Sequence, residues 1–333
     1  MPERNIAEGS TERLEEHEAF KAWRQIQPES FEPEAIELLK WKKKSAVYRL
    51  RGVGPNGAII AKQCQATTAA VERTIYEEFL PSLPLPSLGY YGCLEDPDGQ
   101  SWWLFLEEAG GDLYAPHDPE HRAVAGRWLA AIHSVSSAAD LQALLPDRGP
   151  GHYLQLLRRT RAALLERLGN PALRAEKAPL LRTVAAHYDA IEAHWDELEK
   201  FFDGLPRAVV HGDFVIKNLR IRNGATAPAL LVFDWEMAGW GVPATDLAQS
   251  IGRCVSPDLA VYGSALKQEA SQLDARDIRR LADYGNLLRV MDKIFWQMLD
   301  MVGDRQELLV TPFKPIKKFE PELAAALRAL DWT

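Results

Sequence analysis

The stretch that decides the fold is "HGDFVIKNL" (residues 211–219), followed by "VFDWE" at residues 232–236. Each follows an apolar run, "AVV" in the first case and "ALL" in the second, which predicts two short buried strands. Three side chains with oxygen atoms, Asp213, Asn218 and Asp234, are therefore expected beside strand ends. Because such groups are costly to remove from water without a partner, we expect a ligand or a metal here.

The segment "NGATAP" between the two strands predicts a turn that returns Asp234 close to Asn218. Amide and carboxylate oxygens are ligands that magnesium prefers, and they leave other positions for water or phosphate oxygens. Asp213 lies one loop away and can accept a proton from an attacking hydroxyl group. The arrangement suits phosphoryl transfer, in which positioning and charge neutralisation supply most of the catalysis.

The motif "HGDFVIKN" resembles the HGD-x4-N catalytic loop of the aminoglycoside phosphotransferase and choline kinase family, a relative of the HRD-x4-N loop of protein kinases. "VFDWE" resembles the metal-binding segment of that family, and "GVPATDLA" resembles the motif that follows it. The resemblance implies that Asp213 is the catalytic base and that Asn218 and Asp234 are magnesium ligands. It also implies that Asp246 braces the catalytic loop, which we expect His211 to support rather than to act as a base.

The N-terminal third agrees with this resemblance. "IIAKQC" places Lys62 in mid-strand, like the ATP-phosphate lysine of the family, and Glu72 matches the helix glutamate that pairs with it. Glu77 and Glu78 lie on the same predicted helix, and we expect the glutamates that do not pair with Lys62 to be solvated. Threonines at the start of "TTAAVERTIYEEF" (residues 67–79) are expected to cap this helix.

Two further segments resemble nucleotide-binding parts of the family. "LFLEEAGG" (residues 104–111) resembles the hinge, whose backbone at Glu107 and Ala109 would bind adenine. "KKKSAVYRL" (residues 42–50) resembles the nucleotide-positioning loop, with Ser45 as a phosphate contact. The resemblance covers residues 35–300 in the expected order.

Several side chains keep two interpretations. Lys217 is either solvated or a catalytic cation that balances the charge on the phosphoryl group during transfer. Glu236 either lines the acceptor site or caps local structure. We expect Trp195 and Trp296 to be core residues rather than aromatic platforms for a substrate.

The order of the elements predicts an α+β, two-lobed, protein-kinase-like fold. Before residue 110 the pattern indicates a small β-sheet with one helix, and after it long amphipathic segments indicate a mainly helical lobe. We expect residues 1–30 to form an N-terminal helical extension, residues 31–109 the nucleotide-binding lobe, and residues 110–333 the lobe for catalysis and acceptor binding.

Composition limits the partners. The chain has 333 residues and a net charge of −8, which argues against nucleic acid as the main partner. Three widely spaced cysteines fit a reducing cytoplasm, where we expect the protein as a monomer or homodimer. Because the chain has no apolar run of 18 or more residues, we expect no membrane span.

The sequence therefore predicts an enzyme that moves the γ-phosphoryl group of Mg-ATP to a hydroxyl group of a small molecule. The acceptor could be an antibiotic such as an aminoglycoside, a macrolide or a nucleoside, or an amino alcohol or sugar. The alternative is a degenerate, kinase-like regulatory protein that binds nucleotide without turnover. A protein kinase is disfavoured because the chain lacks D-F-G and A-P-E.

Overall fold

The structure is a computed structural model that describes residues 14–42, 45–135, 139–171, 173, 175–224, 228–249, 254–268, 273–300 and 313–332. The chain divides into two compact units. Unit 1 takes residues 1–114, 143–145 and 218–238, and unit 2 takes residues 115–142, 146–217 and 239–333. Our predicted boundary followed residue 109, whereas unit 1 extends to Tyr114 and also takes in the segment that follows the catalytic loop.

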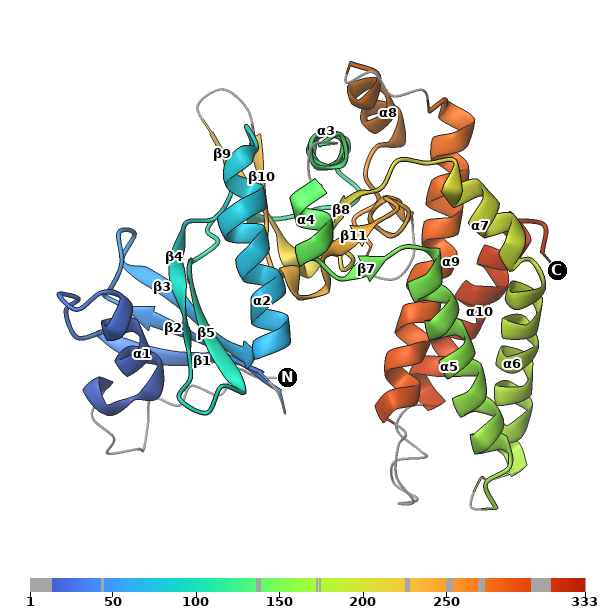
Figure 1. Cartoon of the computed structure of the whole chain (residues 1–333), viewed down its shortest axis with the longest axis horizontal. Coiled ribbons are helices and arrows are strands. Elements are labelled where there is room, and N and C mark those ends of the chain that lie inside the picture. The colour runs from blue at the N-terminus through green and yellow to red at the C-terminus, as the bar shows by residue number, and fades with distance from the viewer. Residues whose placement is uncertain are drawn as a thin grey trace. The chain divides into compact units, whose positions relative to one another are not determined.

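Unit 1 is built on a five-stranded antiparallel sheet in the order β1-β2-β3-β5-β4 (Figure 1). The strands are β1 (Ala35–Lys42), β2 (Ser45–Arg51), β3 (Ala58–Gln65), β4 (Tyr90–Glu95) and β5 (Ser101–Glu107). In the central strand β3, Lys62 is paired with Val47 of β2 and Leu104 of β5. This pairing fixes the position of Lys62 from both sides.

The edge strand β1 was not predicted. Leu39 and Trp41 are exposed in it, and a bulge between Leu38 and Lys40 shifts its register against β2. Because no side of the strand is fully buried, its sequence "AIELLKWK" lacks the alternation of apolar and polar residues that marks a half-buried strand. On the same sheet, helix α1 (Glu18–Ile26) buries Phe20 and Trp23 in a cluster that includes Phe105.

The helix that carries Glu72 follows β3 directly. Helix α2 (Ala66–Thr74) begins at Ala66 and has Gln65 as its N-cap residue, without a side-chain cap hydrogen bond. The predicted threonine caps are therefore wrong, because the helix starts before Thr67. A π-helical segment (Ile75–Phe79) continues α2.

A second, three-stranded antiparallel sheet of unit 1 contains the predicted hairpin. Its strands are β6 (Asp112–Leu113), β9 (Leu219–Asn223) and β10 (Pro228–Val232), in the order β10-β9-β6. Val232 pairs with Leu219 at the end of β9 and β10 where both motifs lie. The backbone N–H of Phe233 then donates a hydrogen bond to the carbonyl oxygen of Asn218 (3.1 Å).

Unit 2 is mainly helical. Its helices are α3 (Pro119–His133), α5 (Pro150–Leu168), α6 (Ala178–Ala193), α7 (Trp195–Asp203), α8 (Leu259–Gln268), α9 (Ala275–Asp300) and α10 (Phe313–Ala329), and α4 (Ala139–Leu144) lies where the chain passes between the two units. Helix α5 packs on α6 and α9, and α10 packs on α6 and α9 (Figure 1). None of the helices that the structure describes combines the length and apolar character needed to cross a bilayer.

A short sheet of unit 2 precedes the catalytic loop. It consists of β7 (Asp147–Arg148), β8 (Ala208–Val210) and β11 (Gly239–Gly241), with β11 in the middle. All three residues of β8 are buried, as the apolar run "AVV" predicts. The strand ends immediately before His211, so the loop that follows starts from a fixed point.

Gly285 allows α9 to approach the segment that contains Asp246. A Cβ atom at Gly285 would overlap the carbonyl oxygen of Ala244, which belongs to the backbone and cannot turn aside. We expect Gly285→Ala to lower the free energy of unfolding by about 1–3 kcal/mol, as overpacking does, although alanine is the better helix former.

Gly263→Ala on α8 is the matched control. Its Cβ atom would lie 2.6 Å from Ile278 Cδ1, which is the end of a flexible side chain and can move. Urea unfolding of both variants measures the difference. Equal stability of the two variants would contradict the close approach at Gly285.

Candidate active site

The predicted phosphate-binding lysine lies among carboxylates in unit 1. Lys62 Nζ forms a buried ion pair with Glu72 Oε1 and a hydrogen bond of 2.6 Å with Asp234 Oδ1. Glu236 Oε2 lies 3.8 Å from the same nitrogen. The side chain of Lys62 is 7% exposed, which excludes a solvated position for this lysine.

Burial and charge act in opposite directions on this group. Burial would lower the pKa of Lys62, but the carboxylates of Glu72, Asp234 and Glu236 raise it well above its usual value. Burial raises the pKa of Glu72 to about 7, although the ammonium of Lys62 opposes that rise. Three carboxyl groups therefore share one buried ammonium, and a further cation would be favourable here.

The same three carboxyl groups fit a metal ion. Oxygens of Glu72, Asp234 and Glu236 lie within 4.8 Å of one another. Glu72 Oε2 is buried and has no hydrogen-bond partner among the described residues. Oxygen atoms are the ligands that magnesium prefers, so the donor set suits it.

The two predicted magnesium ligands lie at the same end of the β9–β10 hairpin. Asn218 is buried, and its backbone carbonyl oxygen accepts a hydrogen bond from the N–H of Phe233, the neighbour of Asp234. Asp234 has a left-handed backbone (φ 65°), which asparagine and aspartate tolerate better than most residues. Such strained residues cluster at functional sites.

Two charged residues, Lys40 and Glu236, lie near Asp234 and were not assigned to this cluster from the sequence. Lys40 Nζ on β1 lies 3.7 Å from Asp234 Oδ2, and its side chain is 39% exposed. Lys40 lies just before the basic run of residues 42–44, outside the segment that resembles the nucleotide-positioning loop. Glu236 was expected either in the acceptor site or as a local cap, and the structure instead brings it toward Lys62.

The predicted adenine and phosphate contacts lie at or just beyond the ends of β5 and β2, two inner strands of the large sheet. The backbone N–H of Glu107, at the end of β5, donates to Gly89 O (2.7 Å), so only its carbonyl group remains a candidate for adenine. The Glu107 carboxylate accepts a hydrogen bond from Arg222 Nη2 (2.7 Å). Ala109 follows the strand and is half-buried, and Ser45 begins β2 opposite Lys42.

The predicted base belongs to unit 2 and is held there by two cations. Asp213 Oδ1 accepts a hydrogen bond from Arg289 Nη2 of α9 (2.9 Å). Asp213 Oδ2 lies 3.1 Å from Lys217 Nζ. Burial would raise the pKa of Asp213, but the charges of Arg289 and Lys217 lower it to about 2. The carboxylate is therefore ionised at neutral pH and can only accept hydrogen bonds.

Asp246 binds the start of the catalytic loop. Its Oδ2 accepts a hydrogen bond from His211 N (2.7 Å), and its Oδ1 accepts one from Gly212 N (3.0 Å). The ring nitrogen Nδ1 of His211 in turn accepts from Asp213 N (3.2 Å). Gly212 has φ 74°, a conformation that favours glycine over other residues. These contacts put Asp246 and His211 where the sequence predicts a brace and a support.

Apolar contacts hold the rest of the loop. Phe214 is buried and stacks on Trp128 of α3 with 5.7 Å between ring centroids. Val215 is also buried and bridges to Cys254. Lys217 differs from these neighbours, since 46% of its side chain is exposed.

Helix α9 corrects one expectation and adds one residue. Trp195 is buried as expected, but the expected core position of Trp296 is wrong because 47% of Trp296 is exposed on α9. Arg289, on the same helix, was not identified from the sequence. Helical periodicity marks it only as one cation among several, and the contact to Asp213 spans 76 positions of the chain.

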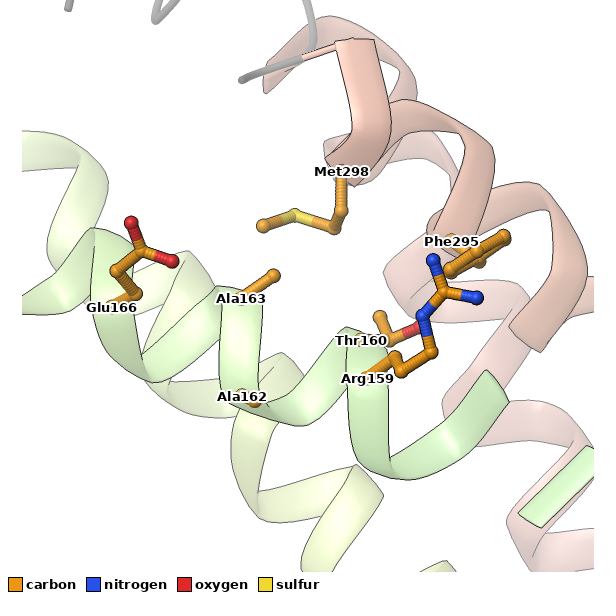
Figure 2. Close-up of a pocket in the computed structure, with 7 residues that line it drawn as sticks. All are labelled: Arg159, Thr160, Ala162, Ala163, Glu166, Phe295 and Met298. Atoms are coloured by element: carbon orange, nitrogen blue, oxygen red, sulfur yellow. The ribbon is translucent and has the colours of Figure 1, made fainter. Parts of the chain in front are cut away.

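A cavity of about 290 Å³ lies between α5 and α9, away from these groups. Figure 2 shows Ala163 and Glu166 of α5 opposite Met298 of α9. The guanidinium of Arg159 lies over the ring of Phe295, 5.1 Å from its centroid. None of the predicted site residues lines this cavity.

The brace can be tested by stability. Burial would raise the pKa of Asp246, but His133 and the backbone of His211 lower it, so its carboxylate stabilises the fold above its unfolded pKa of about 3.9. We expect Asp246→Asn to cost about 1–3 kcal/mol at pH 7. Because the wild-type carboxylate becomes protonated as pH falls through its lowered folded pKa, the difference should shrink there.

Chemical unfolding at a series of pH values measures this difference. Asp203→Asn, at an exposed aspartate at the end of α7, is the control and should change stability by less than about 0.5 kcal/mol. A difference between wild type and Asp246→Asn that stays constant from pH 7 to acid would contradict the role of the carboxylate.

Comparison with known proteins supports the same kind of chemistry. The sequence model of the APH phosphotransferase enzyme family matches residues 57–284. Among curated proteins, none has significant sequence similarity to the chain.

Solved structures share the fold at low sequence identity. The GDP and kanamycin complex of APH(2″)-IIIa has 12% identity and a TM-score of 0.62 over 90% of this chain and 97% of that one. Spectinomycin phosphotransferase APH(9)-Ia with ADP and spectinomycin has 10% identity and a TM-score of 0.61 over 92% and 98%. Choline kinase from Cryptosporidium parvum Iowa II has 11% identity and a TM-score of 0.54 over 87% and 90%.

These likenesses confirm the predicted α+β, kinase-like fold. The family match covers more than half of the chain and includes every predicted site residue except Ser45. The chain therefore belongs to the APH phosphotransferase enzyme family and is a small-molecule phosphotransferase.

Proposed function

We propose that the protein transfers the γ-phosphoryl group of Mg-ATP to a hydroxyl group of a small molecule, with Asp213 as the base. The observation that carries the proposal is the state of Asp213. Its carboxylate follows a buried strand, is ionised at neutral pH, and is held at one oxygen by a buried arginine. A fixed carboxylate of this kind can orient a hydroxyl group and accept its proton.

The transfer forms a bond between the acceptor oxygen and the γ-phosphorus and breaks the bond from that phosphorus to the bridging oxygen of ADP. The acceptor proton passes to Asp213 as the new bond forms. With a pKa of about 2, Asp213 is a weak base, so the proton moves late. That timing agrees with a loose transition state, in which the attacking hydroxyl is positioned before it is deprotonated.

The lysine and carboxylates of unit 1 would bind the donor. Asp234 and Asn218 would hold magnesium, together with Glu236 or the buried Oε2 of Glu72 from the same carboxylate cluster. The ion would neutralise charge on the phosphates when bound. Lys62 Nζ donates a hydrogen bond to Asp234 Oδ1. Phosphate oxygens would compete for the ammonium of Lys62, and Glu72 would keep that ammonium in place.

Lys217 would supply charge during transfer. Its half-exposed ammonium now lies beside Asp213 Oδ2 and is carried by a flexible side chain. We propose that it leaves this oxygen when the acceptor binds and balances the negative charge of the moving phosphoryl group.

Direct assays can identify the nucleotide that donates the phosphoryl group and the molecule that accepts it. One similar structure holds GDP and another holds ADP, so both GTP and ATP should be tested as donors. The similar proteins include a kanamycin complex, a spectinomycin complex and a choline kinase, which supports a screen across aminoglycosides, macrolides, nucleosides, amino alcohols and sugars. ADP formation only in the presence of an acceptor would separate this function from nucleotide binding without turnover.

The assignment of the base predicts a loss of turnover. Asp213→Ala should lower kcat by roughly 10²–10⁴-fold, the range for a lost general base. The dissociation constant for ATP should change little, since Asp213 is assigned to the acceptor rather than to the nucleotide. Asp203→Ala is the control for a lost carboxylate on the surface. Steady-state kinetics and calorimetry measure both effects, and wild-type turnover in Asp213→Ala would remove Asp213 as the base.

The assignment of the donor site predicts a different loss. Lys62→Met and Glu72→Gln should both weaken Mg-ATP binding, and the double variant should lose less than the sum of the two. Glu77→Gln is the matched control, because Glu77 pairs with Arg73 and Tyr90 instead. Calorimetric titration with Mg-ATP tests the set. If Glu77→Gln weakens binding as much as Glu72→Gln, the pairing with Lys62 is not what positions the donor.

A further inference from the structure

Arg289 is a buried charge whose contacts are concentrated on two consecutive residues of the catalytic loop. It lies on α9 and is 5% exposed. Its Nη1 donates to Gly212 O (2.6 Å), and its Nη2 donates to Asp213 Oδ1 (2.9 Å). Burying a guanidinium is costly, and an apolar side chain of similar size would often stabilise a fold at least as well. Stability alone therefore does not explain an arginine at this position.

The geometry of these two contacts fixes the orientation of the Asp213 side chain. One nitrogen binds the backbone just before Asp213 and the other binds its carboxylate, so the carboxylate is held relative to its own backbone. A planar guanidinium can make both bonds at once, whereas the ammonium of a lysine is a single point of charge. Because Arg289 binds Oδ1, Oδ2 is the oxygen of the Asp213 carboxylate that does not bind Arg289.

The two cations at Asp213 differ in mobility. Arg289 is buried in a helix of 26 residues, whereas Lys217 is 46% exposed in the loop. Lys217 can leave Oδ2 for solvent or for a phosphate, and Arg289 has no such freedom. Of the two oxygens, Oδ2 therefore has the more mobile of these two cations beside it.

We propose that Arg289 is a positioning residue for phosphoryl transfer, which binds Asp213 through Oδ1 and reserves Oδ2 for the hydroxyl group of the acceptor. This inference rests on the proposed function in one respect, since it takes Asp213 as the base. It assigns to α9, a helix outside the catalytic motifs, the control of that base.

The charges around Asp213 give the proposal a second consequence. Asp292 lies one turn further along α9. Burial raises the pKa of Asp292, the charge of Arg289 acts to lower it, and the charge of Asp213 acts to raise it. Removal of Arg289 would remove the positive charge that acts on both carboxyl groups and leave their mutual repulsion. The charges that lower the pKa of Asp213 are those of Arg289, Lys217 and His211. The groups that act electrostatically on Arg289 are Asp213, Asp292 and Cys254.

Loss of Arg289 should therefore raise the pKa of Asp213 by about 1–3 pH units, the usual effect of an opposite charge at this distance. Since Asp213 must be ionised to accept a proton, the acidic limb of the pH profile of kcat/KM should move to higher pH. The direction follows from the raised pKa, because a larger fraction of the carboxyl group is then protonated at a given acidic pH.

The test uses Arg289→Met, Arg289→Lys and, as control, Arg280→Met. Arg280 lies on the same helix and pairs with Glu197 rather than with the loop. One readout is kcat and KM for ATP with an acceptor found by the screen. The other needs no acceptor: the ¹³C carboxyl resonance of Asp213, assigned by its absence in Asp213→Asn, is followed as a function of pH.

We expect Arg289→Met to lower kcat on the order of 10²-fold, as a misplaced catalytic group does, with KM for ATP within a few-fold of wild type. Its Asp213 resonance should titrate at higher pH than in wild type. Arg289→Lys should keep the low titration midpoint and recover part of kcat, and Arg280→Met should match wild type in both readouts.

Two results would overturn the inference. One is a wild-type Asp213 resonance with an ordinary midpoint near 3.9, which is measured even if the Met variant fails to fold. The other is wild-type kcat in Arg289→Met. If Asp213→Ala is fully active, the proposed function fails; if Asp213→Ala is inactive and Arg289→Met is not, only the role of Arg289 fails.

Discussion

A single buried ammonium, that of Lys62, balances three carboxyl groups from different segments of unit 1. Glu72 comes from α2, and Asp234 and Glu236 come from the segment after β10, more than 150 positions later in the chain. Removing Lys62 would leave these carboxyl groups without their buried counter-charge, which is strongly destabilising. The large sheet, its helix and the hairpin are therefore tied together by charge as well as by packing.

In unit 2, hydrogen bonds from side chains hold the segment that carries Asp213. The loop that starts at His211 leaves a buried strand and must satisfy its backbone groups before the short 3-10 helix at Ile216–Asn218 begins. Asp246 accepts two of its N–H groups, and Arg289 donates to one of its carbonyl oxygens. Asp213, the proposed base, and the residues before it are thus held by side chains from two separate segments, each of which also packs in the helical core.

Much of the fold and part of the site could be predicted from the sequence. The family and the kinase-like fold could be predicted from two segments, "HGDFVIKN" and "VFDWE". In each of them, polar side chains follow an apolar strand, and the two segments come in a fixed order. Lys62 and Glu72 could be placed since their spacing follows a strand and the helix directly after it. The structure has the predicted pair of Glu72 with Lys62, whereas Glu77, in the π-helical segment beyond Thr74, pairs with Arg73 and Tyr90.

The residues that were missed have physical reasons. Strand β1 is an edge strand without a buried face, and Lys40 was overlooked with it. Trp296 is large and apolar, but one side of α9 is open at its position. Arg289 meets the loop only through the packing of α9, and no local pattern records which side chain of a helix will face a segment 76 positions away.

The left-handed Gly212 limits how such a protein can change. Its N–H is bound to Asp246, its carbonyl oxygen is bound to Arg289, and its φ of 74° excludes most other residues. A loop held at so many points cannot be reshaped gradually to suit a different acceptor. Adaptation to a new acceptor would therefore require substitutions in the surrounding helices, while the loop keeps its conformation.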